Sequence, residues 1–494
     1  MSTSGRGIVK LVTARAASLG IGLAAAPIIS RLYLPRHFGL AGLVQSISTF
    51  LIAFACLGYP RAIPLSGSRG EARALVRLCL VLTGLLLLPV VLVPLLAGGL
   101  VASWLGEEAI EPLLWVVPLV FLLAGLRQTA QYSCSRERRF GTLALQNFGV
   151  TNAGRLGLIA FGGLLGGSAL YVLLSNALGI AVGLLFGASV AARLGFGREE
   201  VERWSLGAAA RQHSQFPRVI VWSRALNAAS RSVPVLLLGG LFTSAVVGYY
   251  TFGQRFLMLP MTILGTSVAD VFYPQAASEW NATGRLEESF RKNVRVLSFF
   301  CIFPMVALCL LGPMMFATVF GSRWTEAGVY ARLLAPAMVV VLLASPVSSV
   351  FSITRHAGLG LCYNVALLVG RAGSLLAGHW LGGPRTAVGC FALVSGLVFV
   401  HLMGSAMRLG GVARRPVACT VLREAALAGA FLLPAAAVEW LTGWSGAAWA
   451  LLGAAGLGYY AWVYRRDPLV QVRVHSLLRR LRRVHSDAGG PNGE

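Results

Sequence analysis

Residues 248–274, GYYTFGQRFLMLPMTILGTSVADVFYP, decide how this chain folds. They are long and apolar enough to cross a bilayer, because a membrane-spanning helix needs about 20 mainly apolar residues. Yet the stretch carries Arg255 near its middle and Asp270 near its end. A charged side chain within a span costs about 2.5–3.5 kcal/mol on insertion scales, and it usually faces a bundle interior or a water-filled cavity. The stretch therefore predicts a membrane helix whose charged residues serve a function.

The composition of the whole chain also indicates that it lies in a lipid bilayer. Of its 494 residues, 56% are hydrophobic and only 12% are charged. One soluble core cannot hide so much apolar surface, so lipid must surround much of the chain. The apolar stretches are continuous, whereas the strands of a membrane barrel alternate, so every span is expected to be helical. The sequence therefore predicts an all-α polytopic membrane protein.

Fourteen segments are long and apolar enough to be spans. They lie near residues 8–29, 39–59, 77–99, 112–131, 141–163, 169–191, 217–239, 244–266, 296–319, 329–351, 358–381, 386–407, 419–437 and 445–464.

Lysine and arginine in the connecting loops predict the orientation of the spans. Cytoplasmic loops are enriched in these residues. With the N-terminus inside, alternate loops and both ends hold 29 basic residues, and the opposite loops hold only Arg31, Arg36, Arg323 and Arg385. The contrast predicts a multi-pass protein of the bacterial inner membrane with both termini cytoplasmic. The net charge of +24 is then largely a topology signal toward anionic membrane lipids, and no nucleic-acid partner is expected.

The C-terminal tail and the cysteines carry weaker signals. The tail places Leu477, Leu478 and Leu481 at helical spacing among arginines, which fits either a helix on the membrane surface or a solvated tail. None of the eight cysteines forms a CxxC pair, so no metal site is predicted. No phosphate-binding loop is present and no cofactor is expected.

An internal repeat is indicated by span lengths and loop charges. Sliding the chain over itself by 209 residues matches Arg15 to Arg224, Gly39 to Gly248 and Gln45 to Gln254. Six spans per half would enter the membrane the same way round, and transporters place substrate between such halves. The predicted domains are an N-lobe at 1–205, a linker at 206–216, a C-lobe at 217–410, two further helices within 411–464 and a basic cytoplasmic tail at 465–494.

The charges predicted to lie within spans are mainly arginines. Arg224 and Arg231 are two helical turns apart and share a face with Asn227. Acidic residues are scarce at that depth, which predicts an anionic substrate. Asp270 and Glu424 lie near predicted cytoplasmic helix ends and are candidates for ion coupling. The candidate substrate-binding residues are Arg15, Arg155, Arg224, Arg231, Arg255, Arg371, Asn227 and Gln254.

These side chains have other uses that the sequence leaves open. Arginines near helix ends can extend to the interface, which suits the shallow Arg15 and Arg224 better than the central Arg155, Arg255 and Arg371. Asparagine and glutamine in membrane helices commonly hydrogen-bond to neighbouring helices.

Two segments resemble a known family. Residues 29–64, ISRLYLPRHFGLAGLVQSISTFLIAFACLGYPRAIP, and 236–289, LLLGGLFTSAVVGYYTFGQRFLMLPMTILGTSVADVFYPQAASEWNATGRLEES, resemble the first and the seventh to eighth helices of Wzx-type polysaccharide transporters. These belong to the multidrug/oligosaccharidyl-lipid/polysaccharide exporter superfamily. The resemblance implies a MATE-like fold of about 14 helices, with two six-helix lobes and two C-terminal helices.

The resemblance also implies a function. The expected substrate is an undecaprenyl-diphosphate-linked oligosaccharide, moved across the inner membrane by alternating access for lipopolysaccharide, exopolysaccharide or another surface polymer. Polysaccharide polymerase and export machinery are the expected protein partners, and no enzyme activity is expected. Arginine suits a diphosphate because its fork donates paired hydrogen bonds and stays protonated.

Three other classes of protein remain alternatives. A drug or cation antiporter of the same fold would be expected to use a mid-membrane carboxylate. A membrane-embedded polymerase or transferase would need catalytic groups, whereas the outer loops are short and their only acidic cluster is Glu107, Glu108 and Glu111. A scaffold would leave the arginines within the spans unexplained.

Overall fold

The computed structural model describes residues 3–197, 204–259, 266–347, 349–354, 356–466 and 471, and for 3–16 and 266–271 it describes the backbone alone. The packing of this chain divides it into two compact units, Met1–Phe252 and Gly253–Glu494. The predicted lobe boundaries at 205 and 217 follow from a sequence repeat rather than from packing, and they stay a prediction. The predicted amphipathic run in the tail, with Leu477, lies outside the described residues.

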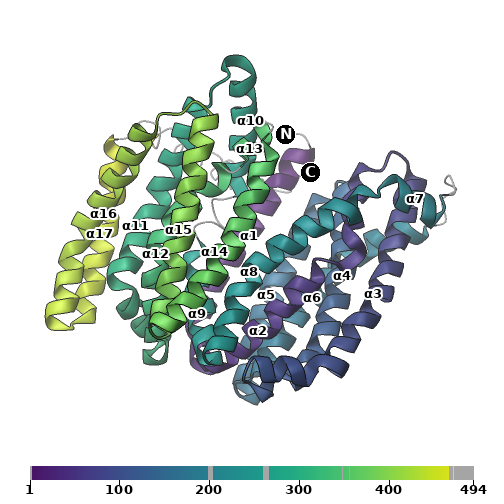
Figure 1. Ribbon diagram of the computed structural model, residues 1–494, viewed down its shortest axis with the longest axis horizontal. Helices are drawn as coiled ribbons and strands as arrows, with labels where there is room; N and C mark the ends of the chain where they lie inside the picture. Colours follow the sequence, from purple (N-terminus) through teal and green to yellow (C-terminus); the bar gives the residue numbers. More distant parts are fainter. Residues whose placement is uncertain are drawn as a thin grey trace, which may run out of the picture. The chain divides into compact units, whose positions relative to one another are not determined.

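The N-terminal unit, Met1–Phe252, is a bundle of long helices (Figure 1). Helix α9 begins in this unit and crosses into the next. The helices are α1 (Thr3–Leu32), α2 (Pro35–Ile52), α3 (Arg69–Trp104), α4 (Val116–Arg136), α5 (Phe140–Leu165), α6 (Ala169–Phe196), α7 (Leu206–Gln212), α8 (Val221–Leu241) and α9 (Ser244–Leu257), with short turns η1 (Ala55–Leu65), η2 (Glu108–Ile110), η3 (Pro112–Trp115) and η4 (Phe216–Ile220).

The C-terminal unit, Gly253–Glu494, is likewise helical throughout its described residues. Its elements are α10 (Thr266–Thr283), α11 (Glu287–Phe320), η6 (Ser322–Trp324), α12 (Thr325–Val347), α13 (Val350–Ile353), α14 (Ala357–Leu381), α15 (Pro384–Leu409), α16 (Arg414–Thr442) and α17 (Ser445–Arg466).

The helices confirm the predicted all-α, polytopic fold. Each of the fourteen predicted spans falls on a described helix, namely α1–α6, α8, α9, α11, α12 and α14–α17. Within the described ranges, nine helices are long and apolar enough to cross a membrane alone, and α1 with α2 forms a further pair that is bent by 113°. The chain is therefore a multi-pass membrane protein.

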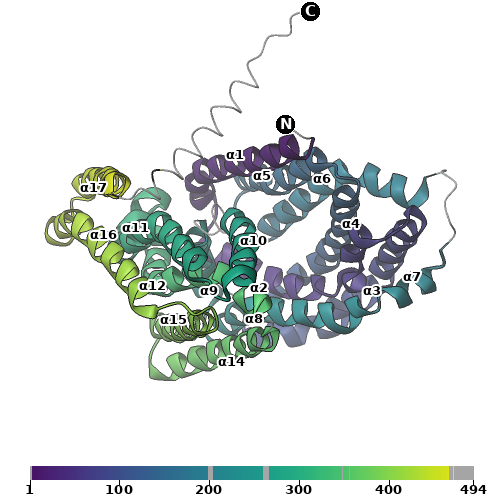
Figure 2. The same ribbon diagram turned by 90° about the horizontal axis from the view of Figure 1, so that it is seen from above.

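Small residues allow the helices of the N-terminal unit to pack closely. Helix α1 lies along α5, and α5 packs along α6 (Figure 2). At the second contact, a methyl group on Gly179 would lie 2.3 Å from the carbonyl oxygen of Val150, and one on Gly154 would lie 3.1 Å from that of Ser175. Glycine is thus needed for backbones to approach in a bilayer, where packing rather than the hydrophobic effect holds helices together.

The second predicted span, 39–59, is interrupted. Helix α2 ends at Ile52, and Cys56, Leu57 and Gly58 follow with φ of 56°, 46° and 78°. These residues lie within η1, and the segment directly after η1 is held by Arg136 of α4, which donates to the carbonyl oxygens of Ser66 at 2.7 Å and Ser68 at 3.0 Å. A distant arginine therefore satisfies carbonyl groups that a continuous helix would have satisfied internally.

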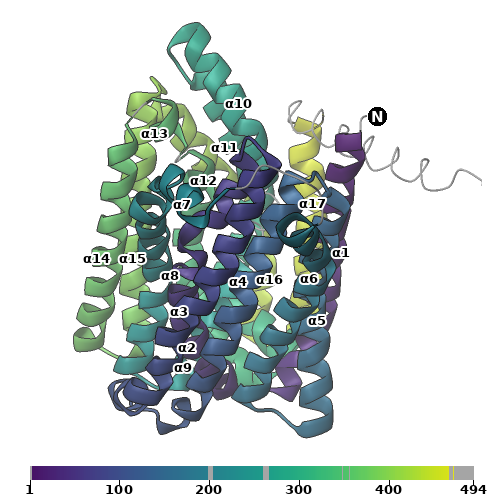
Figure 3. The same ribbon diagram turned by 90° about the vertical axis from the view of Figure 1, so that its right-hand side faces the viewer.

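The stretch 248–274 forms two described helices rather than one. Helix α9 ends at Leu257, residues 260–265 lie outside the description, and α10 begins at Thr266. Figure 3 shows α10 projecting at the end of this unit where residues 284–286 join it to α11. Arg255 and Asp270 consequently lie on different helices.

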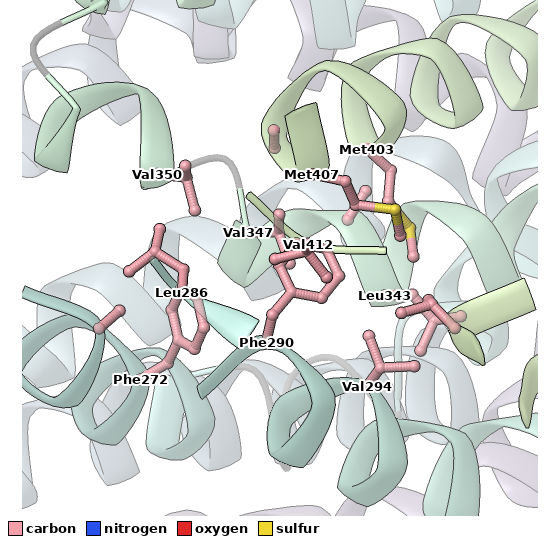
Figure 4. Packing of buried hydrophobic residues seen from close by; sticks show 14 of the residues in the cluster. Phe272, Leu286, Phe290, Val294, Leu343, Val347, Val350, Met403, Met407 and Val412 are labelled. Atoms are coloured by element: carbon pink, nitrogen blue, oxygen red, sulfur yellow. The ribbon is translucent and has the colours of Figure 1, made fainter. Parts of the chain in front are cut away.

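The core of the C-terminal unit joins α10 to α15. Figure 4 shows Phe272 of α10 and Phe290 of α11 facing Val347 of α12, with Met403 and Met407 of α15 closing the cluster. Helices α16 and α17 pack on α11 through a second cluster, in which the rings of Phe303 and Tyr459 stack with their centroids 5.1 Å apart. The two last helices are thereby fixed to α11.

Candidate functional site

A polar stripe on α8 contains three of the predicted site residues. The packing face of α8 buries Ala225, Ala228 and Ser232, whose hydroxyl group donates to the carbonyl oxygen of Ser46 at 3.0 Å. Asn227 and Arg231 are exposed and Arg224 is half-buried. The spacing of three and four residues places them along one side of the helix. The structure therefore brings Arg224, Asn227 and Arg231 together as the sequence predicted.

Helix α4 extends this polar surface. Arg224 Nη2 donates to Gln128 Oε1 of α4 at 3.2 Å. One residue earlier, Arg127 Nη1 donates to Gln131 Oε1 at 3.3 Å. Gln128 was not among the predicted site residues. The signal for it was the sequence RQTAQ inside an apolar segment, which has the spacing of a polar helix face.

Carboxylates are scarce around these cations. Among the residues that the structure describes, no aspartate or glutamate forms an ion pair with Arg224, Arg231 or Arg255. The partner of Arg224 is a neutral amide. The stripe consequently keeps its positive charge, and amide groups lie beside it.

Arg155 contacts a different helix. Its Nη1 donates to the carbonyl oxygen of Ser18 in α1 and to Asn152 Oδ1 at 3.3 Å. Asn152 Nδ2 in turn donates to Ser18 Oγ at 2.8 Å. A methyl group on Gly22 would lie 2.3 Å from the guanidinium of Arg155. Arg155 is thus packed between α1 and α5, where it bridges the two helices.

Gln254 and Arg255 lie in the last turn of α9. Phe256 beside them packs on Phe316 and Phe320 of α11, with ring centroids 5.5 and 4.7 Å apart. Arg255 is exposed and Gln254 is half-buried. The aromatic contact fixes the end of α9 that carries Arg255.

Arg371 lies between α14 and α15. Its Nε donates to Ser395 Oγ at 3.2 Å, and its guanidinium carbon lies 5.5 Å from the ring centroid of Phe391. A cation over an aromatic face is stabilised by the ring quadrupole. This arginine therefore has partners on the neighbouring helix.

Of the two predicted ion-coupling residues, the structure describes the side chain of one. Glu424 of α16 is buried, its Oε1 lies 2.8 Å from Arg423 Nη2, and its Oε2 accepts a hydrogen bond from Tyr459 at 3.1 Å. Asp270 lies in α10 and Arg15 in α1, and the side chains of both lie outside the description. No cluster of histidine, cysteine, aspartate or glutamate that could hold a metal ion occurs in the described ranges.

The polar stripe on α8 has the chemistry of a phosphate and sugar site. Guanidinium groups donate paired, charge-assisted hydrogen bonds to phosphate oxygens. The amides of Asn227 and Gln128 both donate and accept, as hydroxyl groups require. A polar stripe that faced lipid would be costly, so such a helix face normally lines a wet cavity.

Known proteins resemble this chain in sequence and in fold. The sequence model of the family "Polysaccharide biosynthesis protein" matches residues 28–329. The teichuronic acid biosynthesis protein TuaB of Bacillus subtilis (strain 168) is 21% identical over 327 residues, and the match spans 65% of this chain and 65% of that relative. The match to this curated relative thus covers a little under two thirds of its length.

Solved structures share the fold. The lipid II flippase MurJ in an inward closed conformation superposes with a TM-score of 0.72 at 11% identity, covering 93% of this chain and 99% of its own. An inward-facing multidrug resistance MATE family transporter of the MOP superfamily superposes with a TM-score of 0.61 at 15% identity, covering 81% and 98%. The predicted MATE-like fold is confirmed. Because the family model spans more than half of the sequence, the chain belongs to the polysaccharide biosynthesis protein family.

Proposed function

We propose that the protein is a flippase that moves an undecaprenyl-diphosphate-linked oligosaccharide from the cytoplasmic to the outer leaflet of the bacterial inner membrane. It acts by alternating access, without enzyme activity, and its termini are cytoplasmic. The oligosaccharide is destined for a cell-surface polysaccharide. The family membership and two similar proteins, a lipid II flippase and a teichuronic acid biosynthesis protein, support this class of substrate.

The observation that carries the proposal is the stripe on α8. Arg224, Asn227 and Arg231 share one side of a membrane helix, on which Asn227 and Arg231 are exposed and the half-buried Arg224 donates to Gln128 of α4. With no carboxylate paired to these arginines among the described residues, the stripe is a site for an anion that arrives from outside the protein. The diphosphate of a lipid-linked sugar is such an anion, and Asn227 is suited to the sugar hydroxyl groups next to it.

Arg255 and Gln254 are proposed to contact the same substrate. Both lie in the last turn of α9, and Arg255 is exposed there. Arg15, Arg155 and Arg371 are the remaining proposed contacts. Of these, Arg155 and Arg371 already have protein partners, and in our proposal their first role is to join α1 to α5 and α14 to α15.

The membrane potential is proposed to assist the movement. Carrying negative charge outward is favoured by an inside-negative potential, by about 2.3 kcal/mol per charge per 100 mV. A dedicated proton-binding acid is then unnecessary. Glu424, which is hydrogen-bonded to Tyr459 and ion-paired with Arg423, already has the partners of a structural carboxylate. This disfavours the cation antiporter, which would need an accessible acid.

The test is translocation of an undecaprenyl-diphosphate-linked oligosaccharide in proteoliposomes with an imposed potential. Wild type is compared with the double variant Arg231→Ala plus Arg255→Ala. Both side chains are exposed, so the variant should fold. Each lost charge-assisted hydrogen bond is worth about 1.5–3 kcal/mol, so flipping should slow by at least about tenfold.

The matched control is Arg291→Ala plus Arg408→Ala, which removes two exposed arginines near helix ends. Flipping that is retained in the control and lost in the test variant would support the proposal. Equal flipping in both variants would remove the arginines from the substrate site. Proton-coupled uptake of organic cations, without flipping of the lipid-linked sugar, would overturn the flippase proposal itself.

A further inference from the structure

A basic cavity lies at one end of the N-terminal unit, away from the α8 stripe. It has a volume of about 190 Å³ and is lined by four arginines and one carboxylate. Arg69 and Arg73 come from the first turns of α3, Arg139 from the turn between α4 and α5, and Arg193 from the last turn of α6. A single water needs about 10–15 Å³ of such volume, so the cavity has room for an anion of several heavy atoms.

We propose that this cavity binds the phosphate headgroup of an anionic membrane lipid. The site is contained in the N-terminal unit alone and is distinct from the proposed transport site. The proposal therefore stands or falls independently of the flippase function.

The charge in the cavity favours an anion. Four guanidinium groups face one carboxylate, that of Glu137. The ion pair it forms is long, with Arg69 Nη2 and Glu137 Oε2 3.9 Å apart, and the arginine side chain is 55% exposed. Arg139 and Arg193 are exposed, and within the described residues neither forms an ion pair, so these two guanidinium groups can bind an anion. Guanidinium groups that converge in this way donate bidentate hydrogen bonds to phosphate.

The walls of the cavity are held by the fold. Arg77, one turn beyond Arg73, donates its Nε–H to the carbonyl oxygen of Gly195 at 2.8 Å and lies over the ring of Phe196, which ties α3 to the end of α6. Helix α4 ends in a left-handed turn at Arg138, where the amide of Arg139 donates to the carbonyl oxygen of Cys134 at 2.9 Å. Arg139 is therefore presented from an ordered backbone, which lowers the entropic cost of binding.

The position of the cavity, at the end of an apolar stripe on α3, favours a lipid over a free anion. Residues at intervals of one turn run down α3 from Arg73 and Arg77 to Val81, Leu85 and Leu88, which are 53%, 59% and 64% exposed. Such an apolar stripe on a membrane helix faces the acyl chains. At 1.5 Å per residue, Val81 lies about 12 Å along α3 from Arg73, so the arginines lie at the end of this apolar stripe.

The lining of the cavity fits the same ligand. Besides the charged groups it includes Val190 and Leu194 of α6, which are 5% and 9% exposed. An apolar surface beneath a basic rim suits the glycerol and first methylene groups of a lipid as well as its phosphate. Basic pockets between transmembrane helices are a recurrent way of holding anionic headgroups.

The test measures lipid retention on the full-length, detergent-purified protein by native mass spectrometry. Phosphatidylglycerol is the probe, and phosphatidylcholine is the zwitterionic reference. The variant Arg139→Ala plus Arg193→Ala removes two exposed arginines from the cavity, and retention of phosphatidylglycerol should fall by at least about tenfold. Glu137→Gln removes the opposing carboxylate, and retention should rise.

The matched control is Arg138→Ala plus Arg211→Ala. These exposed arginines are close in sequence to the cavity or on the neighbouring α7, but they are not part of its lining. Retention equal to wild type in this control, with loss in the cavity variant, would support the site. An equal loss in both would mean that general surface charge binds the lipid, which overturns it.

A second arm separates the two sources of phosphate. Inorganic diphosphate is titrated into the same protein in the absence of added lipid. Binding of diphosphate that depends on Arg139 and Arg193, without selective retention of phosphatidylglycerol, would overturn the lipid assignment in favour of a soluble anion. Normal thermal unfolding of the cavity variant would confirm that its loss of lipid is not a loss of fold.

Discussion

Gly39 of α2 and Gly248 of α9 lie back to back where the two helices cross. A methyl group on Gly39 would lie 1.6 Å from the carbonyl oxygen of Ser244, and one on Gly248 would lie 1.9 Å from that of Pro35. These two glycines are also the pair that a shift of 209 residues superimposes. Equivalent residues of a repeat meet in this way on a pseudo-twofold axis. The internal repeat itself stays a prediction from the sequence.

Replacing either glycine by alanine should destabilise this crossing. The added methyl group would meet backbone atoms, which cannot rotate away, and overpacking of this kind costs about 1–3 kcal/mol. Thermal unfolding in detergent should therefore show a lower midpoint for Gly39→Ala and for Gly248→Ala.

The matched control for these variants is Gly84→Ala in α3, where a methyl group would meet nothing within 4 Å. Since alanine is the better helix former, this variant should be as stable as wild type or more so. If Gly39→Ala unfolded at the same temperature as wild type, α2 and α9 could separate at no cost in free energy. That result would contradict the close contact of their backbones.

The sequence predicted the helices well because their signal is local. Apolar length alone predicted fourteen segments that each overlap a described helix, and the interval between Arg224 and Arg231 was enough to place both on one face of α8. The end of α2 was less accessible to prediction. Residues 53–59 are as apolar as the helix before them, and the segment that follows is held by Arg136, which donates to the carbonyl oxygen of Ser66, seventy residues earlier in the chain.

The partners of individual arginines were beyond sequence reasoning for the same reason. Arg155 and Arg371 lie within apolar segments just as Arg231 does. Their roles differ because Arg155 contacts Ser18 and Arg371 contacts Ser395. These contacts depend on which helices pack together. Periodicity gives the face of a helix, but it does not give its neighbour.

The buried pair of Glu71 and His213 should make stability depend on pH. Glu71 Oε1 lies 2.7 Å from His213 Nε2, and its Oε2 accepts a hydrogen bond from the amide of Gly67 at 2.8 Å. Burial alone would raise the pKa of Glu71, but these hydrogen bonds outweigh it and lower the pKa below the ordinary value of 4.5. The stabilisation is therefore present above that value and is lost as the pH falls through the lowered pKa.

Glu71→Gln should lower the midpoint of thermal unfolding at neutral pH, because polar groups buried around the side chain lose their charged partner, at about 1–3 kcal/mol. The difference from wild type should shrink once the pH is below 4.5. The exposed pair of Glu288 and Lys292 offers a control, and Glu288→Gln should change little at any pH. A Glu71→Gln deficit that persists undiminished in acid would exclude this origin.

Arg138 occupies a backbone position that favours glycine. Its φ is 52°, at the end of α4, where the left-handed conformation closes the helix. This conformation is strained for a residue with a Cβ atom, and glycine adopts it readily. Arg138→Gly should raise the stability by up to about 1 kcal/mol, whereas Arg138→Ala keeps the strain and should match wild type. Thermal unfolding of the two variants tests this prediction. A lower midpoint for Arg138→Gly than for Arg138→Ala would contradict a strained left-handed conformation at this position.

Arg155 and Arg231 should respond differently to the same substitution. Arg155→Ala removes the bridge from α5 to Ser18 of α1 and leaves that carbonyl oxygen without its arginine partner, so the variant should lose about 1–3 kcal/mol of stability. Arg231→Ala removes an exposed side chain and should unfold within about 0.5 kcal/mol of wild type, yet it should flip the lipid-linked sugar more slowly. Unfolding and flipping measured on the same preparations separate the two roles. If Arg231→Ala were the unstable variant and Arg155→Ala the inactive but stable one, the assignment of structural and substrate-binding arginines would have to be reversed.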